Sequence, residues 1–302
     1  MDLVNGVVLF IKFHIKKLFY DLIRFLFCFN HYIMKVCICG TVKNVGKYLQ
    51  NVFKNMEKIA SLFEEYIIIL YYDKSEDDTL QQLKKYQENN TNFYFYVNTF
   101  PLSKYRTHNI SKGRNICLNK IREKYTNYEY FIMMDCDDVC SGNINLDVLE
   151  KNLQNNEWDA LSFNRKNYYD IWALSIKPYV VSMRHFHNMV SVEKTMKRYV
   201  TKLLDKIPKN KLLPCYSAFN GFSIYKTNVF IRCSYDGKLR LDLIPKKKIS
   251  INQLALNDKI KLIYDSNAED NINQDCEHRS FHLQAIQKFK AKIFISPDIL
   301  FD

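Results

Sequence analysis

Tyr130-Phe131-Ile132-Met133-Met134-Asp135-Cys136-Asp137-Asp138 is an apolar run that ends directly in an acidic cluster. A continuous apolar run of this length is typical of a strand buried on both faces of a parallel sheet. Polar residues that follow such a strand lie at the carboxyl edge of the sheet, where α/β proteins bind their ligands. This segment therefore predicts both the fold class and the place of the functional site.

On both sides of this segment, further predicted strands alternate with predicted helices. Strands are predicted over residues 35–39, 66–72, 93–97, 158–163 and 168–174, and two more around Asn220-Gly221 within 215–225. Helices are predicted up to residue 62 and over 79–87, 110–125, 192–204 and 281–290. Alternating strands and helices predict an α/β fold with a mixed, mostly parallel sheet flanked by helices. We expect the chemistry just after residues 39, 72, 97 and 134.

The composition is that of an ordinary globular protein. Of the 302 residues, 47% are hydrophobic and 25% are charged, which excludes collagen-like, disulfide-miniprotein and multi-span membrane classes. The nine cysteines are odd in number and form no CxxC pair. Reduced thiols in a cytosol-like compartment are therefore predicted, on the cytoplasmic side of the cell and not in a secreted protein.

The net charge of +12 suits anionic partners such as nucleotide phosphates. The basic residues are scattered along the chain, and short runs such as Lys246-Lys247-Lys248 are typical of solvated surface. Steeply salt-dependent binding of nucleic acid would need a concentrated basic stripe. No nucleic-acid partner is predicted.

Residues 1–33 differ from the rest of the chain. Apolar residues recur there at helical spacing, and Lys12, Lys16, Lys17 and Arg24 interrupt any apolar run long enough to span a bilayer. A basic amphipathic helix is predicted. Three interpretations stay open: a helix lying on a membrane surface, a helix packed on the domain, and an extension upstream of a start at Met34.

Asp135 and Asp137 are the strongest candidates for a metal site. Two carboxylates placed two residues apart at a strand end turn toward one cation as the chain leaves the sheet. Carboxylate oxygens suit Mg²⁺ or Mn²⁺, whose other positions are filled by water and substrate phosphates. The alternative is an acidic turn that caps the next helix.

Four further residues are candidates for the same edge of the sheet. Asp73 comes directly after the strand at 66–72, where it can accept hydrogen bonds from a ribose or a base. Arg114 interrupts the apolar stripe of its helix, so it must pair with an anion or stay near the surface. Asn115 and Arg106 lie nearby, and a phosphate near this first helical turn would suit all three side chains. A solvated arginine at the helix end is the alternative for Arg114.

Residues 275–282 concentrate acid, imidazole and thiol groups. His278 and His282 lie four residues apart, on one face if the helix begins that early. A zinc site of Cys276, His278 and His282 is one alternative, although no further ligand pair supports it. A general base together with a metal ligand, both reaching the pocket of the aspartates, fits the cluster better.

Eight short motifs occur in a fixed order. They are GTVKNV (40–45), YDKS (72–75), RTHNISKGRN (106–115), DCDD (135–138), WDA (158–160), YYDIWAL (168–174), AFNGFSIY (218–225) and CEH (276–278). The ordered set resembles a GT-A glycosyltransferase of the kind encoded by large DNA viruses, and it is distantly similar to fungal capsule-associated mannosyltransferases. The resemblance covers roughly residues 34–290. Lys43 stands where the family usually has arginine, and Glu277-His278 where it has Glu-Asp.

The resemblance implies a GT-A domain over residues 34–302, with a nucleotide-sugar-binding half (34–140) and an acceptor-binding half (141–302). It implies that Asp135 and Asp137 hold Mn²⁺ or Mg²⁺ against the donor diphosphate, with His278 or His282 as a further metal ligand. The donor would also be held by Asp73, Arg106, Arg114 and Asn115. The acceptor would face Asp170, Trp172, Asn220 and Gly221. Glu277 stands at the position of the family's catalytic acidic residue, and its carboxylate would act as the general base.

The function that follows is metal-dependent transfer of a sugar from a nucleoside diphosphate to a hydroxyl of a glycan or glycoprotein. A base such as Glu277 predicts inversion at the anomeric carbon. Two rivals stay open: a catalytically inactive GT-A-like module that binds glycans or scaffolds a complex, and a nucleotidyltransferase, which also uses paired aspartates and divalent metals.

Overall fold

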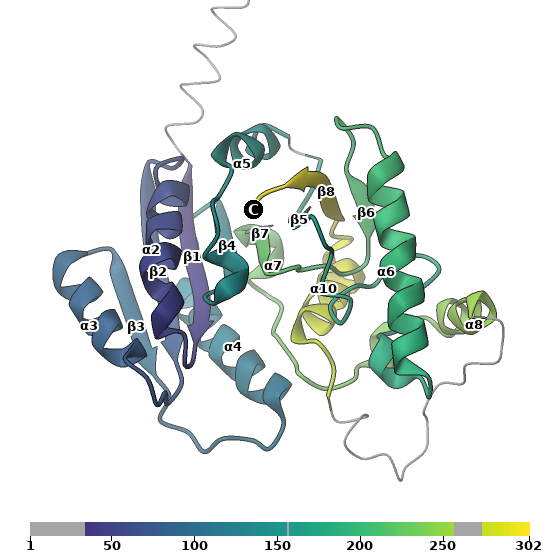
Figure 1. Cartoon of the computed structure of the whole chain (residues 1–302), viewed down its shortest axis with the longest axis horizontal. Helices are drawn as coiled ribbons and strands as arrows, with labels where there is room; N and C mark the ends of the chain where they lie inside the picture. Colours follow the sequence, from purple (N-terminus) through teal and green to yellow (C-terminus); the bar gives the residue numbers. More distant parts are fainter. Residues whose placement is uncertain (1–33, 156, 257–273) are drawn as a thin grey trace, which may run out of the picture.

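A computed structural model describes residues 34–155, 157–256 and 274–302 (Figure 1). The strands are β1 (Lys35–Val42), β2 (Glu65–Tyr72), β3 (Phe93–Val97), β4 (Tyr130–Asp135), β5 (Ala160–Asn164), β6 (Leu213–Cys215), β7 (Phe222–Lys226) and β8 (Ile293–Ile299). The helices are α2 (Gly46–Ala60), α3 (Thr79–Asn89), α4 (Arg106–Lys124), α5 (Leu146–Leu153), α6 (Met189–Lys206), α7 (Thr227–Phe230), α8 (Lys246–Ala255) and α10 (Glu277–Phe289). Short 3-10 helices lie at Asp138–Cys140, Met183–His185 and Leu241–Leu243.

Within these residues the strands form one eight-stranded sheet in the order β3-β2-β1-β4-β7-β5-β8-β6. The pairs β2–β3, β1–β2, β1–β4 and β5–β8 are parallel. Only the pairs that involve β7 or β6 are antiparallel, so these two strands run against the other six. The prediction of a mixed, mostly parallel sheet flanked by helices is confirmed.

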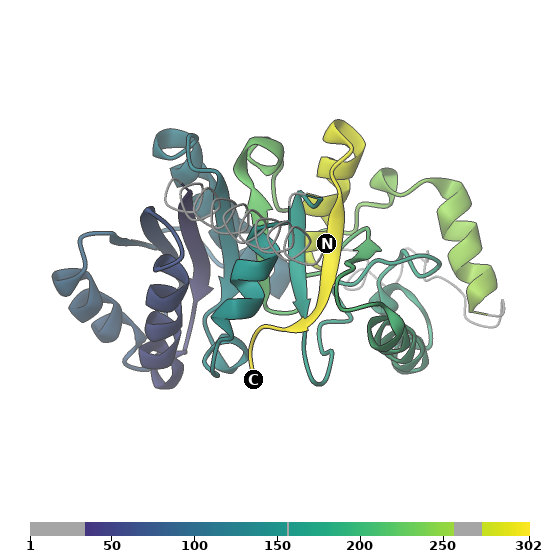
Figure 2. The same ribbon diagram turned by 90° about the horizontal axis from the view of Figure 1, so that it is seen from above.

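Each face of the sheet carries its own hydrophobic core. Val36 and Ile38 of β1 belong to the cluster under α2 and α5, whereas Cys37 and Cys39 belong to the cluster under α4, α7 and α10. Successive residues of a strand point to opposite faces, so a strand covered on both sides is apolar throughout. Figure 2 shows helices on both faces of the sheet. The buried thiols of β1 thus act as small hydrophobic side chains.

The carboxyl ends of the central strands meet at one edge of the sheet. Thr41 of β1 lies opposite Asp135 of β4, and Val42 lies opposite Tyr72 of β2. The antiparallel strand β7 begins at this edge, with Phe222 opposite Met134. Residues that follow β1, β2 and β4 therefore come together with those that precede β7.

Three elements of the second half differ from the prediction. Residues 168–174 form a loop instead of a strand, because their apolar side chains pack into a third core cluster while the backbone joins no strand ladder. Of the two strands predicted within 215–225, β7 follows Asn220-Gly221 as expected, whereas β6 ends at Cys215 and pairs with β8. The closing strand Ile293–Ile299 was not predicted.

Two helices begin earlier than predicted. Helix α4 begins at Arg106 instead of residue 110, and α10 begins at Glu277 instead of residue 281. The second difference places Glu277, His278 and His282 on a single helix. The predicted amphipathic helix of residues 1–33 lies outside the described residues. In the parts of the chain that the structure describes, every helix is too short or too polar to cross a membrane.

The two-layer core predicts a large contrast between matched leucine substitutions. Leu70 of β2 is fully buried, whereas 63% of the Leu254 side chain on α8 is exposed. Leu70→Ala is expected to lower the free energy of unfolding by about 2–5 kcal/mol, because it leaves a cavity beside β1. Leu254→Ala should change it by less than about 0.5 kcal/mol. Urea denaturation measures both, and equal effects would contradict the burial of β2.

Candidate active site

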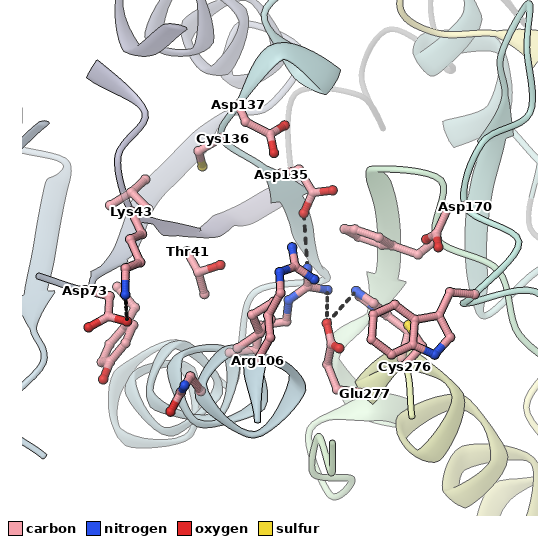
Figure 3. Close-up of a pocket in the computed structure, with 18 of the residues that line it drawn as sticks. Thr41, Lys43, Asp73, Arg106, Asp135, Cys136, Asp137, Asp170, Cys276 and Glu277 are labelled. Atoms are coloured by element: carbon pink, nitrogen blue, oxygen red, sulfur yellow. Dashed lines mark hydrogen bonds and ion pairs between the residues drawn. The ribbon is translucent and has the colours of Figure 1, made fainter. Parts of the chain in front are cut away.

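A cavity of about 750 Å³ opens at the carboxyl edge of the sheet. Its walls come from the ends of β1, β2 and β4, from the start of α4, from the loop after β5 and from the start of α10. Figure 3 shows Asp135 and Asp137 on one wall, Lys43 and Asp73 to one side of them and Asp170 to the other. A cavity therefore lies at the edge of the sheet where the chemistry is predicted.

Arg114, from helix α4, lines this cavity. Only 4% of the residue is exposed. The preceding Gly113 allows α4 to approach the sheet closely, since a Cβ at that position would lie 2.5 Å from Cδ1 of Tyr71. Arg114 Nη2 lies 3.1 Å from Oδ1 of Asp135, and Nη1 lies 3.3 Å from Oε1 of Glu277. One guanidinium thus joins β4 to α10.

The surroundings of Arg114 keep it charged. Burial alone would lower its pKa, but the carboxylates of Glu277 and Asp135 outweigh burial and raise the pKa above its ordinary value. The guanidinium also lies 4.5 Å from the ring centroid of Phe219. Its Nε has no hydrogen-bond partner among the described residues. Arg114 is therefore a fixed cation with a donor to spare, and the alternative of a solvated arginine is wrong.

Asp135 titrates far from its ordinary range. Burial raises its pKa, Arg114 opposes this, and the neighbouring carboxylates of Asp137, Asp170 and Glu277 raise the pKa further, to about 7. Its Oδ2 accepts a hydrogen bond of 3.2 Å from the hydroxyl of Tyr169. The first acidic residue of the predicted metal pair is thus held on both oxygens by protein groups.

Asp137 is less enclosed by the protein. Its Oδ1 accepts a hydrogen bond from the N–H of Val139, and no described residue bonds its Oδ2. Burial raises the pKa of Asp137, and the Val139 N–H partly offsets this. Burial also raises the pKa of Asp170, whose carboxylate accepts hydrogen bonds from the N–H groups of Ala173 and Asn220.

The donor set of the cavity suits a divalent cation. Asp135, Asp137, Asp170 and Glu277 all line it, and the Arg114 guanidinium contacts two of them. Carboxylate oxygens are the ligands that Mg²⁺ and Mn²⁺ prefer. Among the described residues, no three His, Cys, Asp or Glu side chains already form a closed metal site. The zinc alternative of Cys276, His278 and His282 is not supported, because His282 does not line the cavity and both its ring nitrogens contact hydroxyl groups.

The two histidines of α10 differ in their surroundings. His278 lines the cavity, and its Nδ1 shares a hydrogen bond with the hydroxyl of Tyr225. Its Nε2 has no hydrogen-bond partner among the described residues. His282 does not line the cavity, and both its nitrogens contact hydroxyls, those of Ser217 and Tyr225. Burial lowers the pKa of both, that of His282 to about 3. His278 alone is placed to face a cation, so the choice of His282 is not retained.

The other side of the cavity is polar and more open. Asp73 accepts a hydrogen bond of 3.0 Å from the side-chain amide of Asn98, and Lys43 Nζ lies 3.4 Å from its Oδ2. Arg106 is exposed at the start of α4 and lines the same cavity. Asp73 and Arg106 thus reach the cavity from the first half of the sheet, as predicted.

Three of the predicted binding residues have structural contacts instead. Asn115 does not line the cavity, and its side chain bonds the N–H and the carbonyl of Tyr235. Asn220 is 1% exposed, with a φ of 53°, and its Oδ1 accepts from the N–H groups of Tyr169 and Asp170. Gly221 has a φ of 87°, a conformation that favours glycine. Asn220-Gly221 therefore shapes the loop that presents Asp170, instead of facing the cavity.

Several lining residues were not singled out from the sequence. Tyr169 contacts Asp135, and Phe219 packs under Arg114. Both lie inside quoted motifs, next to Asp170 and Asn220, but aromatic side chains in apolar runs give no local signal of a functional role. Trp172, which was predicted, lines the cavity next to Asp170.

The raised pKa of Asp135 predicts a pH dependence of stability. Asp135 binds its proton more tightly in the folded protein, where its pKa is about 7, than in the unfolded chain, where it is near 3.8. Its contribution to the free energy of unfolding is present below pH 3.8 and is lost as the pH rises toward 7. In EDTA, wild type should therefore lose stability relative to Asp135→Asn between pH 4 and about 7. Thermal unfolding at several pH values measures this, and a constant difference would contradict the raised pKa.

A family model of glycosyl transferase family 2 matches residues 37–223, which is more than half of the chain. No curated protein matches the chain. One similar solved structure is S. aureus TarS, with 14% identity and a TM-score of 0.45; the match covers 89% of this chain and 36% of that one. Residues 1–349 of S. aureus TarS in complex with UDP-GlcNAc have 15% identity and a TM-score of 0.44, with 89% of this chain and 57% of that one covered. The mannosyltransferase PcManGT from Pyrobaculum calidifontis in complex with GDP-Man and Mn²⁺ has 12% identity and a TM-score of 0.42, with 68% of this chain and 48% of that one covered.

The chain spans 36% to 57% of the length of these three neighbours, and the similarity is too low to support a conclusion on substrates. The resemblance to viral enzymes and to fungal capsule mannosyltransferases stays a prediction. The sheet order and flanking helices are those of the GT-A fold that the resemblance implies. The matched region runs from Cys37 in β1 to Ser223 in β7 and includes most of the cavity wall, and the chain therefore belongs to glycosyl transferase family 2.

Proposed function

We propose that the chain transfers a sugar from a nucleoside-diphosphate sugar to a hydroxyl group of a glycan or glycoprotein, with Mn²⁺ or Mg²⁺ and with inversion. The observation that carries the proposal is the gathering of Asp135, Asp137, Asp170 and Glu277 around Arg114 at the carboxyl edge of a family 2 domain. In this proposal residues 34–140 form the donor half and residues 141–302 form the acceptor half.

The donor half would hold the nucleoside diphosphate through charge. Asp137 offers an oxygen that the protein leaves free, so we assign it as the main metal ligand, with Asp135 and His278 beside it. The cation would neutralise the charge that grows on the departing diphosphate. Arg114 has an unpaired donor for a phosphate oxygen, and Arg106 adds a second cation at the helix start. Asp73 would accept hydrogen bonds from the nucleoside.

The acceptor half would bring a hydroxyl group to Glu277. Arg114 and His278 both lie next to Oε1 of Glu277, which leaves its Oε2 to take the proton of the acceptor hydroxyl. The oxygen of the acceptor hydroxyl, having given its proton to Glu277, would form the new bond to the anomeric carbon while the bond to the diphosphate breaks and the nucleoside diphosphate leaves. Trp172 offers an aromatic face for the acceptor sugar, and Asp170 is held in place beside it by Asn220 and Ala173.

Asp137→Ala tests the metal site. We expect metal-dependent release of the nucleoside diphosphate to fall roughly 100-fold or more, because the cation loses its main protein ligand. Asp138→Ala is the matched control, since Asp138 is exposed, lies next in sequence and does not line the cavity. Turnover of a panel of UDP-, GDP- and CMP-sugars with Mn²⁺ or EDTA measures both variants.

The products of the same assay separate the rival functions. Full activity of Asp137→Ala would contradict the proposed site. Transfer of the nucleoside monophosphate instead of the sugar would identify a nucleotidyltransferase. Donor binding that ignores the metal, without turnover of any donor, would identify an inactive binding module.

Glu277→Gln tests the proposed base. The amide keeps the shape of the side chain but cannot take a proton, so transfer to the acceptor should fall by about 10²- to 10⁴-fold. Binding of the donor with Mn²⁺, measured by calorimetry, should change far less. Glu123→Gln, in which an exposed glutamate of α4 loses its surface pairing with Lys120, is the control. If Glu277→Gln transfers the sugar as fast as wild type, Glu277 is not the general base.

A further inference from the structure

We propose that Arg279 is a positioning residue that fixes the acceptor loop, residues 172–180, relative to Glu277. The inference rests on the proposed function, because it assigns Trp172 to the acceptor side. Arg279 was not among the residues predicted from the sequence, and it does not line the cavity. Its effect would reach the acceptor through Trp172.

Arg279 is completely enclosed and points at backbone. Only 2% of the residue is exposed. Its Nη1 donates to the carbonyls of Leu174 (3.0 Å) and Val180 (3.2 Å), and its Nη2 donates to the carbonyl of Trp172. One guanidinium thus binds three carbonyls of a loop that lies outside the eight-stranded sheet and forms only the isolated bridges Ser175–Ser217 and Ile176–Tyr179 among the described residues.

The other side of Arg279 ties it to the start of α10. Its Nε donates to Oδ2 of Asp275 (3.0 Å), and Oδ1 of Asp275 accepts from the N–H of Cys276. His185 Nε2 also lies 3.5 Å from Oδ1 of Asp275. Burial would raise the pKa of Asp275, but Arg279 and His185 outweigh it and the pKa stays below its ordinary value, so the pair is ionic. Glu277 lies between the two partners in the sequence.

The clamp adds to the other hydrogen bonds of this loop, in which Ser175 pairs with the backbone of Ser217 and Asn252 Oδ1 accepts from the N–H of Val180. Buried carbonyls must be paired, and Arg279 supplies a donor for those of Trp172 and Leu174. A planar guanidinium can bind several acceptors in fixed directions, whereas a lysine ammonium is a single point donor on a flexible stem. Arg279→Lys therefore keeps the charge beside Asp275 and loses the simultaneous hold on three carbonyls.

The ring of Trp172 reports directly on this loop. The chain has two tryptophans, and Trp158 is 1% exposed, so quenching by acrylamide comes mainly from Trp172. Arg279→Lys should raise the quenching constant about twofold as the loop loosens. Donor hydrolysis should stay within about twofold of wild type, while transfer to methyl glycosides and oligosaccharide probes falls roughly 10- to 100-fold, because a misplaced acceptor does not reach Glu277.

Arg122→Lys is the matched control. Arg122 also clamps backbone carbonyls, those of Ile231 (2.8 Å) and Cys233 (2.6 Å), but it lies on α4 away from the cavity wall. It should leave the quenching constant and the ratio of transfer to hydrolysis unchanged. The proposal is overturned if Arg279→Lys is folded and leaves quenching unchanged, or if it lowers donor hydrolysis as much as transfer, which would indicate a general structural role.

Hydrogen exchange compared between wild type and Arg279→Lys tests the clamp without turnover. Arg279 binds only carbonyls, so the N–H groups of residues 172–180 should exchange faster in the variant as the loop opens more often, and equal exchange in the two proteins would contradict the clamp. Because quenching and exchange need no turnover, they decide on Arg279 even if no donor is consumed. Absence of turnover with a rigid, protected loop would count against the proposed function alone.

Discussion

The buried Arg114 guanidinium holds the cavity together by pairing with two carboxylates that lie far apart in the sequence. Asp135 ends the central strand β4, and Glu277 begins helix α10. A buried charge without partners would be strongly unfavourable, so Arg114 requires both β4 and α10 in their observed places. The close approach of α4 at Gly113 puts the guanidinium at that depth. The two halves of the proposed site thus share one electrostatic anchor.

The negative charge that remains after this pairing is the chemically useful feature. Asp135, Asp137 and Asp170 all have pKa values raised by burial, which means that the metal-free cavity carries more carboxylates than it can stabilise as anions. A nucleoside diphosphate would be repelled by this cluster. A divalent cation would remove both problems, because it pairs with the carboxylates and with the diphosphate at once. The same electrostatics that strain the empty site therefore favour the bound one.

The first half of the fold and the central acids were predictable from the sequence because their signals are local. An apolar run such as residues 66–72 indicates a doubly covered strand, and the carboxyl edge follows from that. Arg114 was found because an arginine on an apolar helical stripe needs an anion. The Asp135–Asp137 pair was found in the same way, from its place after a buried strand.

The misassigned residues depend on contacts between distant segments. Residues 168–174 look like a strand, yet their carbonyls bind Arg279 of α10, about a hundred residues away in sequence. Asn115 and Asn220 look like ligand-binding amides, yet both are used by nearby backbone groups. His282 shares a helical face with His278, but its two nitrogens contact buried hydroxyls. Spacing along the chain cannot show which polar groups are already paired in the folded protein.

The proposed metal site is tested most directly by a crystal structure of the full chain with Mn²⁺ and a nucleoside diphosphate. Anomalous diffraction data collected at the manganese absorption edge would locate the ion. We predict a manganese peak in contact with the Asp137 carboxylate and with the diphosphate, with Arg114 still between Asp135 and Glu277 or shifted toward a phosphate oxygen. Manganese bound away from Asp137, or a diphosphate bound in the cavity without the metal, would contradict it.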